Sequence, residues 1–172
     1  MGDLYMRNDE RPQIEVNRRK LGIKSMYFNR YLLVRYVSAL LFFTNIYWLI
    51  SLSLSDSFLY FIPLILIVVF LFSIVEQVKI YGTHTNNAKY TKHAFRTILF
   101  TNVILMVFLY FPSAFNQLYP FLLDQEKSKI LVLIILLTGI LLSTLILYRL
   151  HKIKHDQDKH YGRIKKYENA LN

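Results

Sequence analysis

His151 and His155 are the residues whose types and spacing come closest to a metal site. Imidazoles four residues apart share one face of a helix and can bind a divalent cation together, and Asp158 and His160 follow closely. The segment is otherwise rich in lysine and arginine, so solvated histidines are the simpler interpretation, and we predict no metal site. The chain has no cysteine, which excludes thiolate catalysis, disulfides and thiolate metal ligands.

Other catalytic signatures are absent from the sequence. It contains no Walker A motif, no His-Glu-x-x-His and no Gly-x-Ser-x-Gly. No charged residue interrupts the long apolar runs described below, and Asp56 and Glu76 stand at their ends. A charge inside the membrane usually marks the pathway of a proton-coupled transporter, and small four-span multidrug exporters depend on such a glutamate. We therefore predict no catalytic residue and no cofactor.

Two asparagines in apolar surroundings are the strongest candidates for a polar role. Asn45 follows Thr44, Asn102 follows Thr101, and each pair stands between a phenylalanine and an aliphatic residue. An amide without a partner in hydrocarbon costs several kcal/mol, whereas between helices it contributes about 0.6 kcal/mol on average. We predict that both pairs hold helices together. A contact with a ligand or ion, and an internal duplication of a two-helix unit, are the alternatives.

Small residues indicate where helices can approach closely. Gly139 and Ser143 are four residues apart in a run rich in leucine and isoleucine, the spacing of a close helix–helix contact. Glycine and alanine are scarce in the other apolar runs. Gly139 is therefore the first candidate for a contact with another helix or with a partner protein.

These candidates lie in four apolar runs. The chain of 172 residues is 54% hydrophobic, and uncharged hydrophobic runs of about 18 residues or more indicate membrane helices. The polar face that a helix of a soluble protein would show is missing. The predicted fold is all-α, with a transmembrane domain at 25–148 and four spans at about 36–55, 57–80, 90–111 and 130–148.

The third apolar run extends to residue 123, which is too long for one upright helix. Pro112 and Pro120 divide it, and aromatic residues follow Pro112. We predict an outer interfacial segment at 112–123; a re-entrant loop is the alternative. The connection around Asp56 is short and predicts a tight hairpin between the first two spans.

Lysine and arginine predict the orientation. All but two of the 21, Lys127 and Lys129, lie before the first uncharged run (36–55), between the second (57–75) and the third (97–123), or after the fourth (130–148). Because cytoplasmic loops carry the excess of positive charge, we predict that both termini are cytoplasmic.

The N-terminal segment 1–24 is basic and polar, and a helical pattern begins at Ser25. Basic side chains beside an anionic inner leaflet gain roughly 1 kcal/mol each. We predict a helix that skims or gently enters the membrane, and inner-leaflet anchoring by six residues: Arg18, Arg19, Lys20, Lys24, Arg30 and Arg35. Nucleic-acid binding is the alternative for this basic cluster, but no nucleic-acid-binding motif accompanies it, and we predict no such partner.

The tail at 149–172 is predicted to be a basic cytoplasmic helix that lies against the N-terminal segment. Its apolar and aromatic residues follow a weak heptad pattern. Contact with a partner or with a second copy of the chain is therefore the alternative.

The run EVNRRKLGIKSMYFNRYLLVRY at 15–36, followed by four apolar spans, resembles a family of small membrane proteins of low-GC Gram-positive bacteria. Members often carry the label of a phosphotransferase-system cellobiose transporter subunit. The resemblance covers nearly the whole chain and implies a four-span fold in a bacterial plasma membrane, associated with sugar transport. Such systems pass phosphate through histidine or cysteine on soluble domains, and this chain has no cytosolic segment large enough for one.

The sequence thus favours a non-catalytic integral membrane protein. We expect a small accessory or regulatory subunit of a larger envelope or transport complex, whose partners are the lipid bilayer and a larger membrane protein or a second copy. A transporter or channel subunit that moves a small solute is one alternative. A membrane protein of the bacteriocin-immunity type fits the size and topology equally well.

Overall fold

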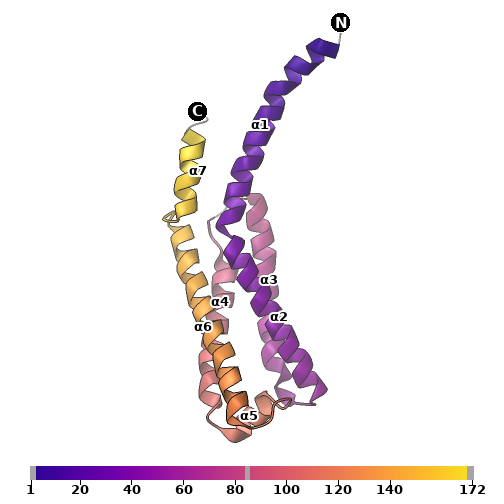
Figure 1. Ribbon diagram of the computed structural model, residues 1–172, viewed down its shortest axis with the longest axis vertical. Helices are drawn as coiled ribbons and strands as arrows, with labels where there is room; N and C mark the ends of the chain where they lie inside the picture. Colours follow the sequence, from indigo (N-terminus) through magenta and orange to yellow (C-terminus); the bar gives the residue numbers. More distant parts are fainter. Residues whose placement is uncertain (1–2, 84–85, 170–172) are drawn as a thin grey trace.

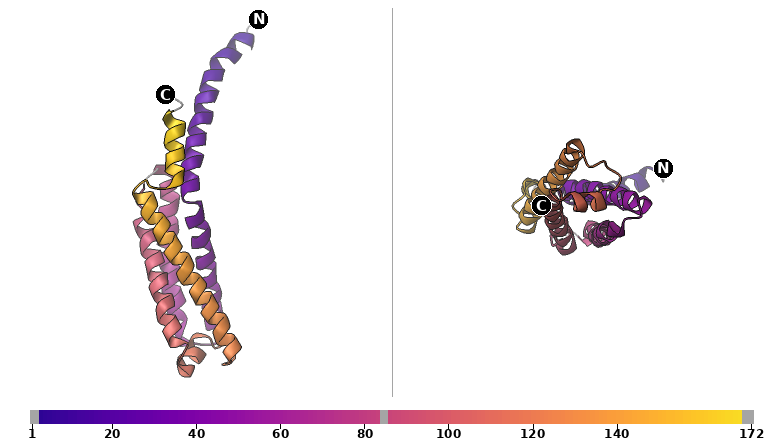
Figure 2. Two further views of the ribbon diagram at one scale, coloured as in Figure 1. Left: turned by 60° about the vertical axis from the view of Figure 1, so that its left-hand side comes forward. Right: turned by 90° about the horizontal axis from the view of Figure 1, so that it is seen from below.

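Helices form every regular element in the computed structural model, which describes residues 3–83 and 86–169. The predicted all-α fold is confirmed. Four long helices lie side by side as a bundle (Figures 1 and 2). They are α2 (Leu32–Leu54), α3 (Phe61–Thr83), α4 (Lys89–Phe108) and α6 (Glu126–Lys154).

Shorter or projecting helices occupy the two ends of the bundle. One end carries α1 (Asp3–Arg30) and α7 (Lys159–Asn169), which extend beyond it together with both termini (Figure 1). The opposite end carries the 3-10 turn η1 (Phe58–Tyr60) and the short helix α5 (Pro112–Leu118).

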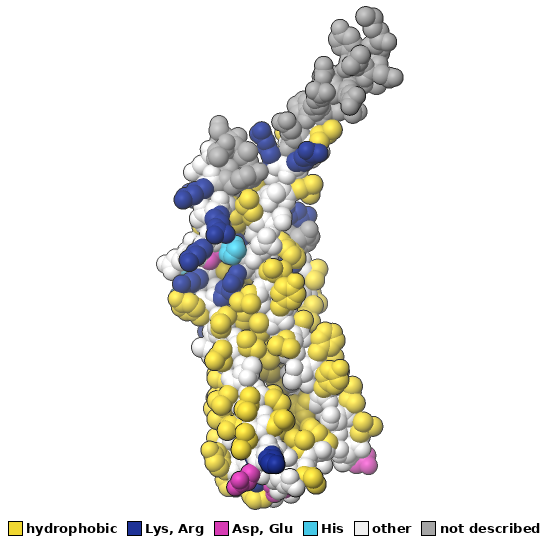
Figure 3. Space-filling view, viewed as in Figure 1, with side chains coloured by type: hydrophobic (Ala, Val, Ile, Leu, Met, Phe, Trp, Pro, Cys, Tyr) yellow, Lys and Arg dark blue, Asp and Glu magenta, His cyan; other side chains and the backbone are white. Residues whose placement is uncertain are grey.

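Among the described residues, three segments are long and apolar enough to cross a membrane. They are Leu32–Leu54, Phe58–Ile80 and Glu126–Lys166. Exposed aliphatic and aromatic side chains cover the face of the bundle seen in Figure 3, where they are yellow. The helix α4 is not one of the three, because Lys89, Lys92 and Arg96 lie in its first turns.

Tight packing and one polar bridge hold the bundle together near α1 and α7. Phe70 of α3 and Phe95 of α4 are fully buried and meet edge to face, with ring centroids 5.9 Å apart. The buried amide of Gln77 on α3 donates to Ser38 Oγ of α2 and to Ser73 Oγ, each at 3.0 Å. Because these buried polar groups satisfy one another, they do not carry the cost of an unpaired amide in an apolar setting.

The opposite end is closed by the segment that follows α4. Pro112 starts α5, where a missing N–H costs nothing because that donor has no partner within the helix. Phe115, Leu118 and Tyr119 are buried against the ends of α4 and α6. The tight hairpin between α2 and α3 is present, and Asp56 makes its turn with a φ of 51°.

The N-terminal helix is longer than the sequence predicted. It begins at Asp3 rather than near Ser25, and only Tyr31 separates it from α2. α1 projects from the end of the bundle and leads away from it, roughly along the long axis of the bundle (Figure 2). α7 packs along α1, the contact predicted for the tail, after a break at Asp156 with a φ of 54°.

Glu76 of α3 caps the N-terminus of α4. The N-cap residue of α4, Ala88, has no side chain that could bind the free N–H groups. Glu76 accepts hydrogen bonds from the backbone N–H of Tyr90 (3.0 Å) and Thr91 (2.7 Å), and from Thr91 Oγ1 (2.8 Å). Its negative charge also complements the positive end of the helix dipole.

We expect Glu76→Ala to loosen the first turn of α4 by about 1 kcal/mol, the usual effect of losing a cap. Hydrogen exchange of the Tyr90 and Thr91 amides should accelerate about fivefold. Glu126→Ala, which removes an exposed carboxylate from the first turn of α6, is the matched control and should leave these amides unchanged. Equal exchange in the two variants would contradict the capping role.

Candidate functional site

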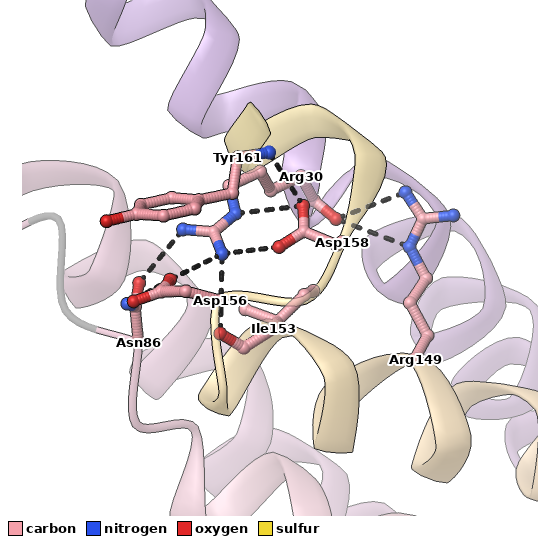
Figure 4. A network of polar contacts seen from close by, with 7 residues as sticks. All are labelled: Arg30, Asn86, Arg149, Ile153, Asp156, Asp158 and Tyr161. Carbon is pink, nitrogen blue, oxygen red and sulfur yellow. Dashed lines mark hydrogen bonds and ion pairs between the residues drawn. The ribbon is translucent and has the colours of Figure 1, made fainter. Parts of the chain in front are cut away.

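Arg30, the last residue of α1, is the largest fully buried side chain of the protein as described. It lies where four parts of the chain meet: the ends of α1 and α6, the start of α7, and the loop before α4 (Figure 4). An arginine is almost never fully buried unless it is paired. The group of Arg30, Asn86, Asp156 and Asp158 is called the arginine node below.

The guanidinium of Arg30 uses its donors on partners from all of these elements. Nε and Nη2 form a forked pair with Asp158, at 3.1 and 2.5 Å. Nη2 also donates to Asp156 (2.9 Å) and to the carbonyl of Ile153 at the end of α6 (3.3 Å), and Nη1 donates to Asn86 Oδ1 (3.1 Å). Two-point pairing with a carboxylate fixes direction as well as distance.

Neighbouring groups complete the arginine node. Asn86 Nδ2 donates to Asp156 at 2.7 Å, which joins two of the partners of Arg30. The Tyr161 ring lies with its centroid 5.0 Å from the guanidinium carbon, an arrangement that favours a cation. Arg149 of α6 donates to the carbonyl oxygen of Arg30 (3.3 and 3.4 Å) and so satisfies an otherwise open carbonyl at the end of α1.

Charge and burial have opposite effects on the pKa of Asp158. Burial alone would raise its pKa, but the hydrogen bonds and positive charge of Arg30 outweigh burial and lower the pKa below its ordinary value of 3.8. The uncharged run of α6 at 130–148 ends before this residue. The arginine node is therefore ionised at neutral pH.

The lowered pKa of Asp158 predicts a dependence on acid. A group whose pKa is lower in the folded state stabilises that state fully above its unfolded pKa, and the stabilisation disappears as the pH falls through the folded pKa. We expect the docking of α7 on α1 to be constant from neutral pH down to about 4 and to weaken below it. Hydrogen exchange of the α7 amides against pH would measure this, and unchanged protection below pH 3 would contradict it.

Arg30 therefore departs from the predicted role as an inner-leaflet anchor, because it is enclosed by protein. Arg18 and Arg19 are exposed on α1, about 17 Å beyond Arg30 at 1.5 Å per residue. Arg35 donates to the carbonyl of Gln77 (3.2 Å) and lies over the Phe28 ring (4.1 Å). Lys24 is half-buried, and the side chain of Lys20 lies outside the described residues.

A pocket of about 240 Å³ brings four of the predicted contact residues together. Thr44 and Asn45 reach it from α2, Asn102 from α4 and Gly139 from α6. Trp48 and Tyr119 lie at its α5 end, where their rings stack with centroids 5.9 Å apart and Trp48 Nε1 donates to the carbonyl of Leu118 (3.0 Å). Apart from Ser51, the rest of the lining is aliphatic and aromatic.

The two asparagines have different surroundings. Asn45 is 5% exposed, and its amide donates to the carbonyl of Leu41 in its own helix (2.7 Å). Asn102 is 8% exposed and packs directly on Gly139, where a Cβ would overlap its Nδ2 atom. Within residues 3–83 and 86–169, no protein group forms a hydrogen bond with the Asn102 side chain.

The hydroxyl of Thr44 serves its own helix, and the other two predicted residues, Thr101 and Ser143, do not line this pocket. Thr44 Oγ1 donates to the carbonyl of Leu40 (2.8 Å). Thr101 faces a different hollow, beside Leu59 and Gln117. Ser143 is fully buried one turn from Gly139, and its hydroxyl has no hydrogen-bond partner in the described part of the chain.

Comparisons with protein-family models, with curated proteins and with solved structures found no match.

The ring centroids of His151 and His155 lie 4.7 Å apart. The described residues contain no group of three histidine or carboxylate side chains that could hold a metal ion. Geometry therefore directs attention to the arginine node and the pocket.

Sequence reasoning did not identify the arginine node. The available signal was a pair of acidic residues, Asp156 and Asp158, in a strongly basic tail. Acidic residues in such a setting find cationic partners, but the tail and the N-terminal segment offer many, and sequence alone does not select Arg30.

Proposed function

We propose that this chain is a non-catalytic integral membrane protein that acts as a small accessory or regulatory subunit of a larger membrane complex. It crosses a bacterial plasma membrane four times, has both termini in the cytoplasm, and presents the α1–α7 pair to a cytoplasmic part of its partner. The observation that carries this proposal is the arginine node, which holds that helix pair in one orientation at the end of the bundle.

The position of α4 supports a fourth span. α4 packs along α3 on one side and along α6 on the other, and all three run the length of the bundle (Figure 1). If α3 and α6 cross the bilayer, a helix packed between them crosses as well. Lys89, Lys92 and Arg96 are then at the cytoplasmic end of α4, where long basic side chains can reach the headgroups.

The distribution of charge at the two ends supports the orientation. Both termini and the loop before α4 lie at one end (Figure 1), and this end carries all but two of the lysines and arginines. At the other end, Lys129 is neutralised by Asp124 at 2.7 Å, and Asp56 and Glu126 add negative charge. This asymmetry is typical of a cytoplasmic end and an outer end.

The length of α1 supports a partner in the cytoplasm. At 1.5 Å per residue, the 28 residues of α1 extend about 42 Å and the 11 residues of α7 about 16 Å. More than half of α1 therefore continues past α7. Ile14 and Val16 are exposed there at 48% and 47%, which provides apolar contact area for a partner on the projecting part of α1.

Topology is tested with single cysteines, because the chain has none of its own. Asn87 and Asn116 are exposed on either side of α4. A membrane-impermeant maleimide should label Asn116→Cys in intact cells, and Asn87→Cys only after the membrane is opened. Labelling of both from one side would show that α4 does not cross.

The subunit role is tested by purification from the native host in a mild detergent, followed by mass spectrometry. We expect one larger membrane protein at a near-equal ratio, and Arg30→Leu should reduce its recovery while the bundle stays intact. A clean homo-oligomer would overturn the proposal. Solute flux in liposomes by the chain alone, abolished by Asn45→Leu and Asn102→Leu, would instead establish the transporter alternative.

A further inference from the structure

The pocket between α2, α4 and α6 contains a buried amide whose hydrogen-bonding groups are not used by the protein. Asn102 is more than nine-tenths buried and lines the pocket, and no described residue forms a hydrogen bond with its side chain. Its Nδ2 and Oδ1 atoms are not fully enclosed, because Ser143 Oγ is the one fully enclosed side-chain polar atom without a partner in the described part of the chain. Asn45 lines the same pocket and donates one amide proton to the carbonyl of Leu41, and no residue in the described ranges donates to its side-chain carbonyl oxygen.

The pocket opens sideways, between α2 and α6. Its outer lining is made by exposed side chains of these helices, Tyr47 at 73%, Leu131 at 52% and Ile135 at 50%. In the membrane proposed above, that side faces the hydrocarbon of the bilayer. A molecule dissolved in the bilayer can therefore enter without passing through water.

The depth of the asparagines excludes a charged headgroup. Asn45 lies near the middle of α2, about 20 Å from its start and about 14 Å from its end at 1.5 Å per residue, and the hydrocarbon core is about 30 Å thick. None of the described residues that line the pocket carries a charge. A phosphate or carboxylate placed there would have no counter-ion in a low-dielectric setting.

From these observations we infer that the pocket binds an uncharged, single-chain lipid bearing one hydroxyl group. The hydroxyl accepts a hydrogen bond from the amide of Asn102 and donates one to a side-chain carbonyl oxygen of Asn102 or Asn45. The chain leaves between Tyr47 and Ile135 into the bilayer. The volume of about 240 Å³ is just below that of pockets for drug-sized ligands, about 300–1,000 Å³, so the pocket encloses one end of such a molecule.

Trp48 makes this inference directly measurable, because it is the chain's one tryptophan and it lines the pocket. The purified protein in lipid nanodiscs is titrated with a long-chain alcohol brominated near its hydroxyl end, and quenching of Trp48 fluorescence is followed. We expect saturable quenching that the unbrominated alcohol reverses. The brominated alkane of equal length should bind about three- to tenfold more weakly, the value of one neutral hydrogen bond.

Two variants distinguish the contribution of the hydrogen bond to binding from that of the pocket volume. Asn102→Leu keeps a side chain of similar length and should remove the preference for the alcohol over the alkane. Ser51→Phe places a ring in the pocket from its rim and should abolish saturable quenching by either compound. Ser53→Phe is the matched control, because Ser53 is exposed on the same helix and does not line the pocket, and it should leave quenching unchanged.

The possible outcomes decide the inference. Equal binding of alcohol and alkane would show a pocket for hydrocarbon chains only and would overturn it, as would quenching that never saturates. Stronger binding of a brominated fatty carboxylate would overturn the requirement for an uncharged ligand. These results do not depend on a protein partner, so they are separate from the test of the subunit role.

Discussion

Replacing Arg30 with leucine is expected to release α7 from α1 while the four-helix bundle stays folded. The substitution leaves the carboxylates of Asp156 and Asp158 without their shared cation, and removing one member of a buried ion pair costs about 3–5 kcal/mol. We expect the lower end of this range, about 3 kcal/mol, because Asp156 keeps 34% of its side chain exposed and can be hydrated. Protection of the α7 amides against hydrogen exchange should fall about a hundredfold.

Two further substitutions identify the cause. Arg163→Leu removes an exposed arginine from α7 itself and should leave protection of α7 unchanged, which controls for the loss of a positive charge. Arg30→Lys keeps the charge but not the fork that binds Asp158 at two points, and an intermediate loss is expected. If α7 in Arg30→Leu stays as protected as in the parent, the node does not hold the helix pair.

Gly139→Ala is expected to lower the stability of the bundle more than the addition of a methyl group at any other position. A Cβ at this position would overlap Nδ2 of Asn102, which is itself enclosed between α4 and α6. Overpacking of this kind costs about 1–3 kcal/mol. The melting temperature in detergent, followed by circular dichroism, should fall by several degrees.

A second glycine, Gly162 in α7, provides a matched control. Gly162 in α7 has no atom within 4 Å of a Cβ built on it, so Gly162→Ala should be neutral or stabilise by up to about 1 kcal/mol through helix propensity. The double variant Gly139→Ala with Asn102→Ala removes the overlapping amide and should recover most of the loss, which a double-mutant cycle would quantify. A stable Gly139→Ala protein would show that α4 and α6 do not approach as closely as the structure places them.

The sequence predicted the positions of the long helices better than the contacts between them, for physical reasons. Uninterrupted apolar runs allow only a helix or a barrel strand in a membrane, so the long helices could be located without knowing what they touch. The interest in Asn45, Asn102 and Gly139 also came from sequence, because a polar or very small residue in a leucine-rich run needs an explanation. The contact of Asn102 with Gly139 depends on the axial offset and the rotation of α4 relative to α6, and no local sequence pattern determines these.

The cap on α4 and the arginine node show a second reason why the contacts could not be predicted from the sequence. Thr83 to Asn87 offer local cap residues, yet Glu76 of the preceding helix binds the free N–H groups, and Asn86 serves Arg30 instead. Both arrangements join groups that are distant along the chain. The helix at 3–24 was missed for a different reason, since its polar composition has no apolar periodicity to detect.

The arginine node also has a consequence for the order of assembly. Arg30 and Asp158 are separated by 128 positions, whereas α2–α3, α3–α4 and α4–α6 are neighbours along the chain or nearly so. The bundle can therefore form while synthesis continues, and α1 receives its partners only when the last helix leaves the ribosome. Closure of the node is thus a late step, one that a nascent or truncated chain cannot complete.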